Sequence, residues 1–104
     1  MIVEERTYHV LTGKLPEVVR LYETEGTAIQ QPILGNLIGA FTVDIGELSS
    51  IVQLWGYDSY AERERRRAEL QADEAWVAFL ARLQPLLHTQ WNRILVPTRF
   101  SPIR

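Results

Sequence analysis

The chain contains four runs in which apolar, β-branched and aromatic residues follow the two-residue alternation of a β-strand. The predicted strands are residues 2–11, 37–44, 50–57 and 90–96. Gly13 and Pro97 follow the first and last of these runs and end them. The two middle runs are joined by a short segment that contains Gly46, so they predict a β-hairpin.

Between the strands, apolar residues recur at every third or fourth position, as in amphipathic helices. The predicted helices are residues 14–25, 59–72 and 74–84, with one or two further helical turns within 27–36. Pro16 suits the start of the first helix, and Gly26 is expected to end it. Ser59 and Asp73 are the expected N-caps of the later helices, and Pro85 ends the last one. The strongest apolar stripe belongs to that last helix and consists of Trp76, Phe79, Leu80 and Leu83.

The elements follow the order β–α–β–β–α–β, with the second helix in two pieces. This order is typical of the ferredoxin-like α+β sandwich, in which one four-stranded antiparallel sheet carries helices on one face. A chain of 104 residues has room for one hydrophobic core, so residues 1–104 are predicted to form a single domain.

Helices can cover only one face of such a sheet. Within residues 51–57, Trp55 and Tyr57 leave one face of the strand, while Val52 and Leu54 leave the other. An aromatic face left open to water is unusual on a monomer. We therefore predict a homodimer in which two sheets pack face to face as a dimeric α/β barrel. The alternative is a partly open face with isolated exposed aromatic residues.

Composition excludes several classes of function. The 11 basic and 13 acidic residues give a net charge of -2, which argues against nucleic-acid binding through a basic face. Cysteine is absent, so disulfides and thiolate chemistry are excluded. Met1 to Arg6 carry two glutamates where a targeting peptide would be basic or apolar, and no apolar run is long enough to insert into a membrane. We expect a cytoplasmic protein.

Residues that could carry chemistry are few. No phosphate-binding glycine loop, HExxH motif or nucleophile-elbow motif occurs, and no cofactor is predicted. His9 and His88 lie far apart in the sequence, so no metal site is predicted, and a haem ligand at His88 is far less favoured than a histidine at the surface. The charged run 62–67 is interpreted as a solvated helix face rather than as a patch for phosphate or membranes.

A more promising set lies on the strands, where a rigid scaffold can hold it. The candidate ligand-binding residues are Arg6, Tyr8, Trp55, Tyr57 and Asn92. If these residues share a face of the sheet, they line a mostly apolar cavity with one arginine, which suits a small apolar or carboxylate-bearing molecule or an enolate. The alternatives are that they only pack a dimer interface and that Arg6 pairs with Glu4 or Glu5. No catalytic residue is assigned, because no suitable base shares that face.

Eight short runs in the same order resemble the NIPSNAP family, from Glu5 to about Pro102. The runs are Glu5-Arg6-Thr7-Tyr8, Leu11-Thr12-Gly13-Lys14, Gly35-Asn36-Leu37-Ile38-Gly39, Leu54-Trp55-Gly56-Tyr57-Asp58-Ser59, Glu64-Arg65-Arg66-Arg67, Asp73-Glu74-Ala75-Trp76, Asn92-Arg93-Ile94-Leu95 and Pro97-Thr98-Arg99-Phe100-Ser101-Pro102. The resemblance implies a fold of the dimeric α/β barrel group, which agrees with the predicted homodimer.

The resemblance implies less about activity, because one fold supports unrelated functions. Members of the wider barrel group include cofactor-free monooxygenases and small-ligand isomerases. The first hypothesis is therefore small-molecule binding or cofactor-free catalysis in the barrel cavity. The alternative is a non-catalytic protein-interaction or scaffold module, as eukaryotic relatives of the family suggest. Whether the chain is an enzyme stays open.

Overall fold

The computed structural model describes all 104 residues, and its elements follow the predicted order. They are β1 (Ile2–Val10), α1 (Leu15–Leu21), a π-helical turn (Tyr22–Gly26), α2 (Thr27–Leu34), β2 (Asn36–Thr42), β3 (Ser50–Tyr57), α3 (Tyr60–Ala72), α4 (Glu74–Leu83), a 3-10 turn (Gln84–Leu86) and β4 (Leu87–Leu95).

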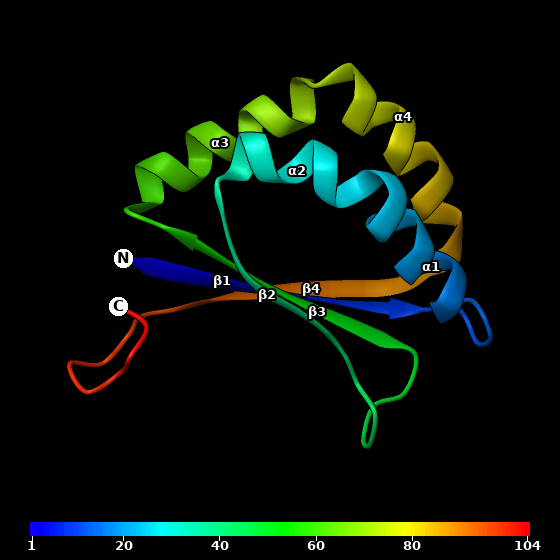
Figure 1. Cartoon of the computed structure of the whole chain (residues 1–104), viewed down its shortest axis with the longest axis horizontal. Helices are drawn as coiled ribbons and strands as arrows, with labels where there is room; N and C mark the ends of the chain where they lie inside the picture. Colours follow the sequence, from blue (N-terminus) through cyan, green and yellow to red (C-terminus); the bar gives the residue numbers. More distant parts are fainter.

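The four strands form one antiparallel sheet in the order β2-β3-β1-β4. The helices arch over one face of this sheet, and no helix covers the other (Figure 1). The ferredoxin-like α+β fold and the β2–β3 hairpin are thus confirmed. β1 and β3 lie at the centre of the sheet, where the order of elements places them.

The prediction that Gly26 ends the first helix is wrong. The chain stays helical from Leu15 to Leu34 and passes through one wider turn, in which the Thr27 N–H donates to the Tyr22 carbonyl. Gly26 has ordinary helical dihedrals, with φ of -60° and ψ of -46°. Its role is close packing, because a Cβ atom there would lie 2.6 Å from Cζ of Phe79. Glycine at this position admits the Phe79 ring.

The predicted helix caps are confirmed. The Ser59 hydroxyl accepts a hydrogen bond from the Glu62 N–H at 3.1 Å, and the Asp73 carboxylate accepts one from the Trp76 N–H at 2.9 Å. The strand ends differ from the prediction. β4 begins at Leu87, three residues before the predicted start, and enters the sheet through an irregularity beside His9 and Val10. β2 ends at Thr42 rather than at residue 44.

Trp55 and Tyr57 lie beneath the helices, where their side chains are 0% and 3% exposed. The expectation that this aromatic pair stays uncovered in one subunit is therefore wrong, because the chain's own helices bury it. The uncovered face carries the half-buried Val52 and Leu54 instead. We call this uncovered side the open face; its central residues are Val3, Glu5, Thr7, Val52, Leu54 and Arg93.

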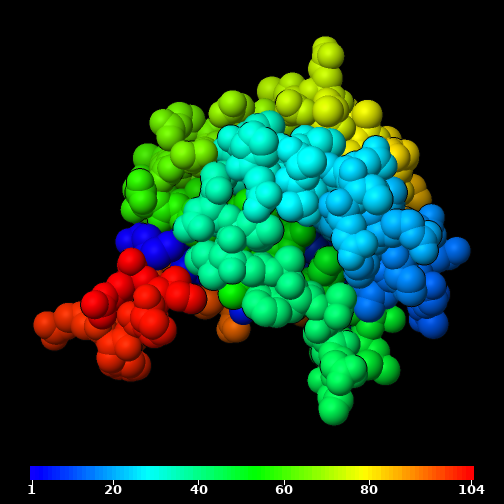
Figure 2. Space-filling model, viewed as in Figure 1, coloured from blue at the N-terminus to red at the C-terminus, as the bar shows by residue number.

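Two segments project from the open face at opposite ends of the sheet. One is the β2–β3 loop, residues 43–49, and the other is the C-terminal segment, residues 96–104 (Figure 2). Both expose apolar side chains: Ile45 is 91% exposed and Phe100 is 88% exposed. Burying such apolar side chains against another surface is favourable, because it removes them from water.

Candidate functional site

The five candidate residues all point toward the helices. In the sheet Arg6 pairs with Gln53 on one side and with Asn92 on the other, and Glu4 pairs with Trp55. Residues directly opposite each other in an antiparallel pair leave the same face. Tyr8 and Tyr57 follow by the two-residue period, so the predicted common face exists.

The structure brings only part of this set to one cavity. Arg6 and Tyr8 line a space of about 210 Å³ between the sheet and the helices, whereas Trp55, Tyr57 and Asn92 do not line it. The Trp55 indole N–H donates to the Gln53 side-chain oxygen at 3.1 Å within the core. Asn92 donates to Glu4 at 2.6 Å, behind the cavity. The sequence thus predicts the correct face of the sheet, but three of the five candidate residues do not line the cavity.

The lining of the cavity combines polar and apolar residues. Its polar residues are Arg6, Tyr8, Tyr22, Arg67, Gln71, Gln84 and Gln90. Its apolar residues are Trp76, Leu80, Leu83 and Leu87. Gln84 lies in the 3-10 turn and Gln90 in β4, and both are exposed residues. Such a mixed lining suits a ligand with one polar and one apolar end.

Glu4 organises the polar residues behind the cavity. Its side chain is fully buried, and one oxygen, Oε2, accepts hydrogen bonds from Arg63 at 2.6 Å, Asn92 at 2.6 Å and Arg6 at 3.0 Å. Burial alone would raise the pKa of this carboxyl. The hydrogen bonds from Arg63 and Asn92 and the two arginine charges outweigh burial and hold the pKa below its ordinary value. Glu4 is therefore a carboxylate at neutral pH.

Arg6 is held firmly by its neighbours. Its Nη1 donates to Glu4, and its Nε donates to the Tyr8 hydroxyl at 2.8 Å. The pairing of Arg6 with Glu4 is one of the alternatives expected from sequence, and the structure confirms it. Tyr22 lies against Tyr8, and burial together with Tyr8 raises the pKa of the Tyr22 phenol well above its ordinary value. Tyr22 therefore stays protonated.

The interpretation of the charged run as a solvated face is wrong for part of α3. Arg63 binds the buried Glu4 and Arg66 donates to the Ile33 carbonyl at 3.0 Å. Arg67 lines the cavity. These three residues and the buried Leu70 share one side of the helix, at the spacing usually taken by an apolar stripe. That spacing is the signal by which the sequence could have revealed them.

Arg67 differs from the other arginines of this site. It takes part in none of the six ion pairs of the chain. Its Nη1 is buried without a hydrogen-bond partner. Burial, and then the positive charge of Arg6, lower the pKa of Arg67, although Glu4 acts in the opposite sense. A half-buried arginine whose buried Nη1 lacks a partner is costly and requires an explanation.

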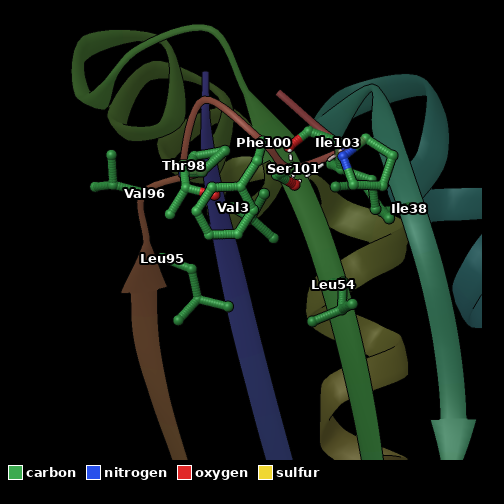
Figure 3. A pocket seen from close by; sticks show the side chains of 11 residues that line it. Val3, Ile38, Leu54, Leu95, Val96, Thr98, Phe100, Ser101 and Ile103 are labelled. Atoms are coloured by element: carbon green, nitrogen blue, oxygen red, sulfur yellow. Dashed lines mark hydrogen bonds between the residues drawn. The ribbon is translucent and has the colours of Figure 1, made fainter.

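A larger and different hollow lies on the open face. It measures about 440 Å³ and lies between the C-terminal segment and the sheet, with Val3, Leu54, Leu95 and Phe100 among its walls (Figure 3). None of its lining residues is charged. We call it the tail groove. It contains none of the candidate residues and is suited to apolar contact rather than to chemistry.

The two histidines lie outside the cavity. His9, on the open face, binds Glu47 at 2.8 Å and stacks against Trp91 with ring centres 4.6 Å apart. No three His, Asp or Glu side chains gather as a metal site. None of the helices combines the length and the apolar character needed to cross a lipid bilayer.

Comparison with known families identifies the chain. The NIPSNAP family model matches residues 3–102. The chain belongs to the NIPSNAP family. Among solved structures, a NIPSNAP family protein from Agrobacterium tumefaciens is 52% identical, with a TM-score of 0.97 over 99% of this chain and 98% of that one. An uncharacterized NIPSNAP-like domain protein from Burkholderia xenovorans is 47% identical, with a TM-score of 0.95 over 97% and 88% of the two chains.

Curated relatives are longer than this chain. Protein NipSnap homolog 1 of Danio rerio is 29% identical over 104 residues, which cover 99% of this chain but 36% of that protein. The NipSnap homolog of Dictyostelium discoideum is 29% identical, with 92% and 42% covered. The chain thus spans well under half the length of these two relatives.

More distant structures share the fold alone. An antibiotic biosynthesis monooxygenase is 12% identical, with a TM-score of 0.66 over 94% of this chain. A ferredoxin-like protein described as dimeric, from an uncultured marine organism, is 13% identical, with a TM-score of 0.75 over 96% of this chain. Their activities are not transferred by fold.

Proposed function

We propose that this NIPSNAP protein binds a small carboxylate-bearing organic molecule in the cavity between the sheet and helices α3 and α4. The observation that carries the proposal is the cavity itself, whose lining combines arginine and phenol groups with Trp76 and the leucines. Its 210 Å³ is below the range of about 300–1,000 Å³ common for drug-sized ligands, so the ligand is small. The cavity lining contains no histidine, aspartate or glutamate, so cofactor-free catalysis there would need a base supplied by the ligand itself.

Native mass spectrometry of the purified protein tests this proposal. We expect a bound molecule of low mass that dissociates on collisional activation. Leu80→Trp places a larger side chain in the cavity from α4 and should abolish the adduct. Val77→Trp adds the same ring on the exposed side of α4 and is the matched control.

An adduct that survives Leu80→Trp but disappears with Val77→Trp would place the ligand outside the cavity and contradict the proposal. So would a wild-type protein that carries no adduct and binds no member of a library of small organic acids and their amides.

The proposed assembly is a homodimer formed through the open face. Phe41 and Trp91 are 55% and 49% exposed there, beside the half-buried Val52 and Leu54. The tail groove adds further apolar surface to that side. A ferredoxin-like structure of similar fold is described as dimeric, which supports a dimer but not a particular interface. Trp55 and Tyr57 are buried beneath the helices and are not part of this interface.

Light scattering tests the assembly. We expect twice 12.0 kDa, or about 24 kDa, at micromolar concentration. Leu54→Asp should shift the protein toward the monomer because it places a charge on the open face, whereas Val77→Asp on the outside of α4 should not. A wild-type monomer would contradict the dimer and leave the ligand proposal untouched.

A protein-interaction module is the second candidate function. The observation that favours it is the same open face, with the exposed Ile45 and Phe100 on the two segments that project from its ends. If light scattering finds a stable monomer and native mass spectrometry finds no ligand, this second function is the one that the open face supports.

A further inference from the structure

We propose that Arg67 of α3, and not Arg6, is the group that binds the acidic end of the ligand, and that the ligand is therefore a singly charged carboxylate with an apolar tail. This inference rests on the proposed ligand-binding function and deepens it. It assigns the chemistry of recognition to a residue outside the candidate set drawn from the sequence.

The hydrogen bonds of the site distinguish the two arginines. Arg6 already gives Nη1 to Glu4 at 3.0 Å and Nε to Tyr8 at 2.8 Å. Arg67 has no protein partner at Nη1, although that atom is buried, and no ion pair. Arg6 is thus held in place by two protein hydrogen bonds, whereas the buried Nη1 of Arg67 is a donor that a ligand can satisfy.

The charges lead to the same residue. Glu4 is the one carboxylate of this network, and Arg6 and Arg63 both bind its Oε2. Arg67 receives only the more distant influence of Glu4, which burial and the charge of Arg6 outweigh. A carboxylate at Arg67 would supply the missing negative charge. Two N–H···O bonds from one guanidinium also match the two oxygens of a carboxylate.

The surroundings of Arg67 describe the rest of the ligand. Gln71 lies one helical turn further along α3 and lines the same cavity, so an amide can assist the guanidinium. Trp76, Leu80 and Leu83 line the cavity from α4 and provide no charge. A short acid with an aromatic or branched apolar tail fits this lining, and a dicarboxylate would bury its second charge against leucine and tryptophan at high cost.

Calorimetric titration with three related probes tests the assignment. The probes are phenylacetate, its neutral analogue phenylacetamide and the dianion phenylmalonate. We expect the wild-type protein to bind phenylacetate at least about tenfold more tightly than either of the others, since a charged hydrogen-bonded pair contributes that much or more.

Variants of α3 then isolate the residue. Arg67→Gln should weaken phenylacetate binding by about tenfold to a hundredfold and leave phenylacetamide unchanged, and Arg67→Lys should recover part of the loss. Arg65→Gln removes the same charge from the exposed side of α3 and is the control. Arg67→Met, measured without ligand, should raise the melting temperature, because it removes a half-buried cation whose buried Nη1 lacks a partner.

The outcomes separate the inference from the proposed function. Equal binding of acid and amide, or phenylacetate binding that Arg67→Gln leaves intact, overturns the role of Arg67 while ligand binding stands. A lower melting temperature for Arg67→Met overturns it as well, since it would show that Arg67 serves the fold. If the wild-type protein binds no probe but native mass spectrometry finds an acidic adduct that Arg67→Gln retains and Leu80→Trp removes, only the inference fails; if neither method finds an acidic ligand, both fail.

Discussion

Helices α3 and α4 cover the same face of the same sheet with opposite kinds of side chain. Beneath α4, Trp76 and Phe79 stack with ring centres 5.1 Å apart, and Leu83 is 1% exposed. Beneath α3, Arg63 reaches a fully buried Glu4. The cavity lies where these two regions meet and is lined from both.

The difference teaches where stability and recognition reside in this fold. Removing apolar side chains from water contributes about 25 cal/mol per Å², so we expect the α4 half to contribute more to stability than the α3 half. A buried ionic network contributes little net stability, because desolvation offsets attraction. Its value lies in the geometry that it imposes on Arg6, Tyr8 and their neighbours. Four changes test this division, in order of decreasing effect.

Trp76→Ala should have the largest effect on stability. The side chain is 4% exposed and stacks on Phe79, so its removal leaves a cavity in the apolar half. We expect a loss of about 3–5 kcal/mol in the free energy of unfolding, measured by chemical denaturation. A loss below about 1 kcal/mol would show that the α4 half is not the stabilising core.

Glu4→Gln should cost about 3 kcal/mol, because it leaves Arg6 and Arg63 without their shared carboxylate. Denaturation of this variant is compared with Glu25→Gln, whose ion pair with Arg82 lies at the surface of the helices, away from the open face. The Glu25 variant should lose much less stability, because an exposed ion pair contributes little. Equal losses for the two variants would mean that burial of the network has no energetic consequence.

The contribution of Glu4 should depend on pH in one direction. Its pKa in the folded protein lies below the ordinary value of 4.5, so the unfolded chain takes up the proton first as pH falls. The stabilisation is complete above about pH 4.5 and is lost as pH falls through the lowered pKa. The stability difference between the wild type and Glu4→Gln should therefore narrow below pH 4.5. A constant difference down to pH 3 would contradict the ionised state of Glu4.

Ser59→Ala should have the smallest effect. It removes the hydroxyl that accepts the Glu62 N–H at the start of α3, which costs about 1 kcal/mol. Thermal unfolding should show a single transition at slightly lower temperature. If α3 instead melts separately from α4, the two halves are less coupled than their contact through the cavity implies.

The sequence predicts the fold well because its signals are local. Alternation, helical spacing and the caps at Ser59 and Asp73 depend on neighbours in the chain, and all appear in the structure. The sequence gives the wrong role to Gly26, because the need for glycine there comes from another element: the Phe79 ring of α4 packs against it. A close approach between distant elements leaves no local pattern.

The site was predicted in part for the same reason. The two-residue period correctly places Arg6 and Tyr8 on one face, and the order of strands places them beside Trp55. Which face of the sheet the helices cover depends on packing between distant elements. The alternation in β3 therefore cannot show that Trp55 and Tyr57 lie on the covered face. The sequence does not single out Arg67, because a run of charged residues is usually solvated. Only the three-residue spacing between Arg67 and the buried Leu70 indicates that Arg67 lies on the inner side of α3.

The π-helical turn at Tyr22–Gly26 holds one residue more than a regular α-helix would need between α1 and α2. One residue of an α-helix turns the chain by about 100°, and the wider turn absorbs this increment, so the buried sides of α1 and α2 stay in phase. Deleting a single exposed residue there, such as Glu23, should therefore let α1 and α2 join as one regular helix with Gln30 and Leu34 still buried. A one-residue deletion within α2 has no such reserve and should turn Leu34 out of the core. Among folded relatives, one-residue gaps should thus be more frequent at this turn than within α2.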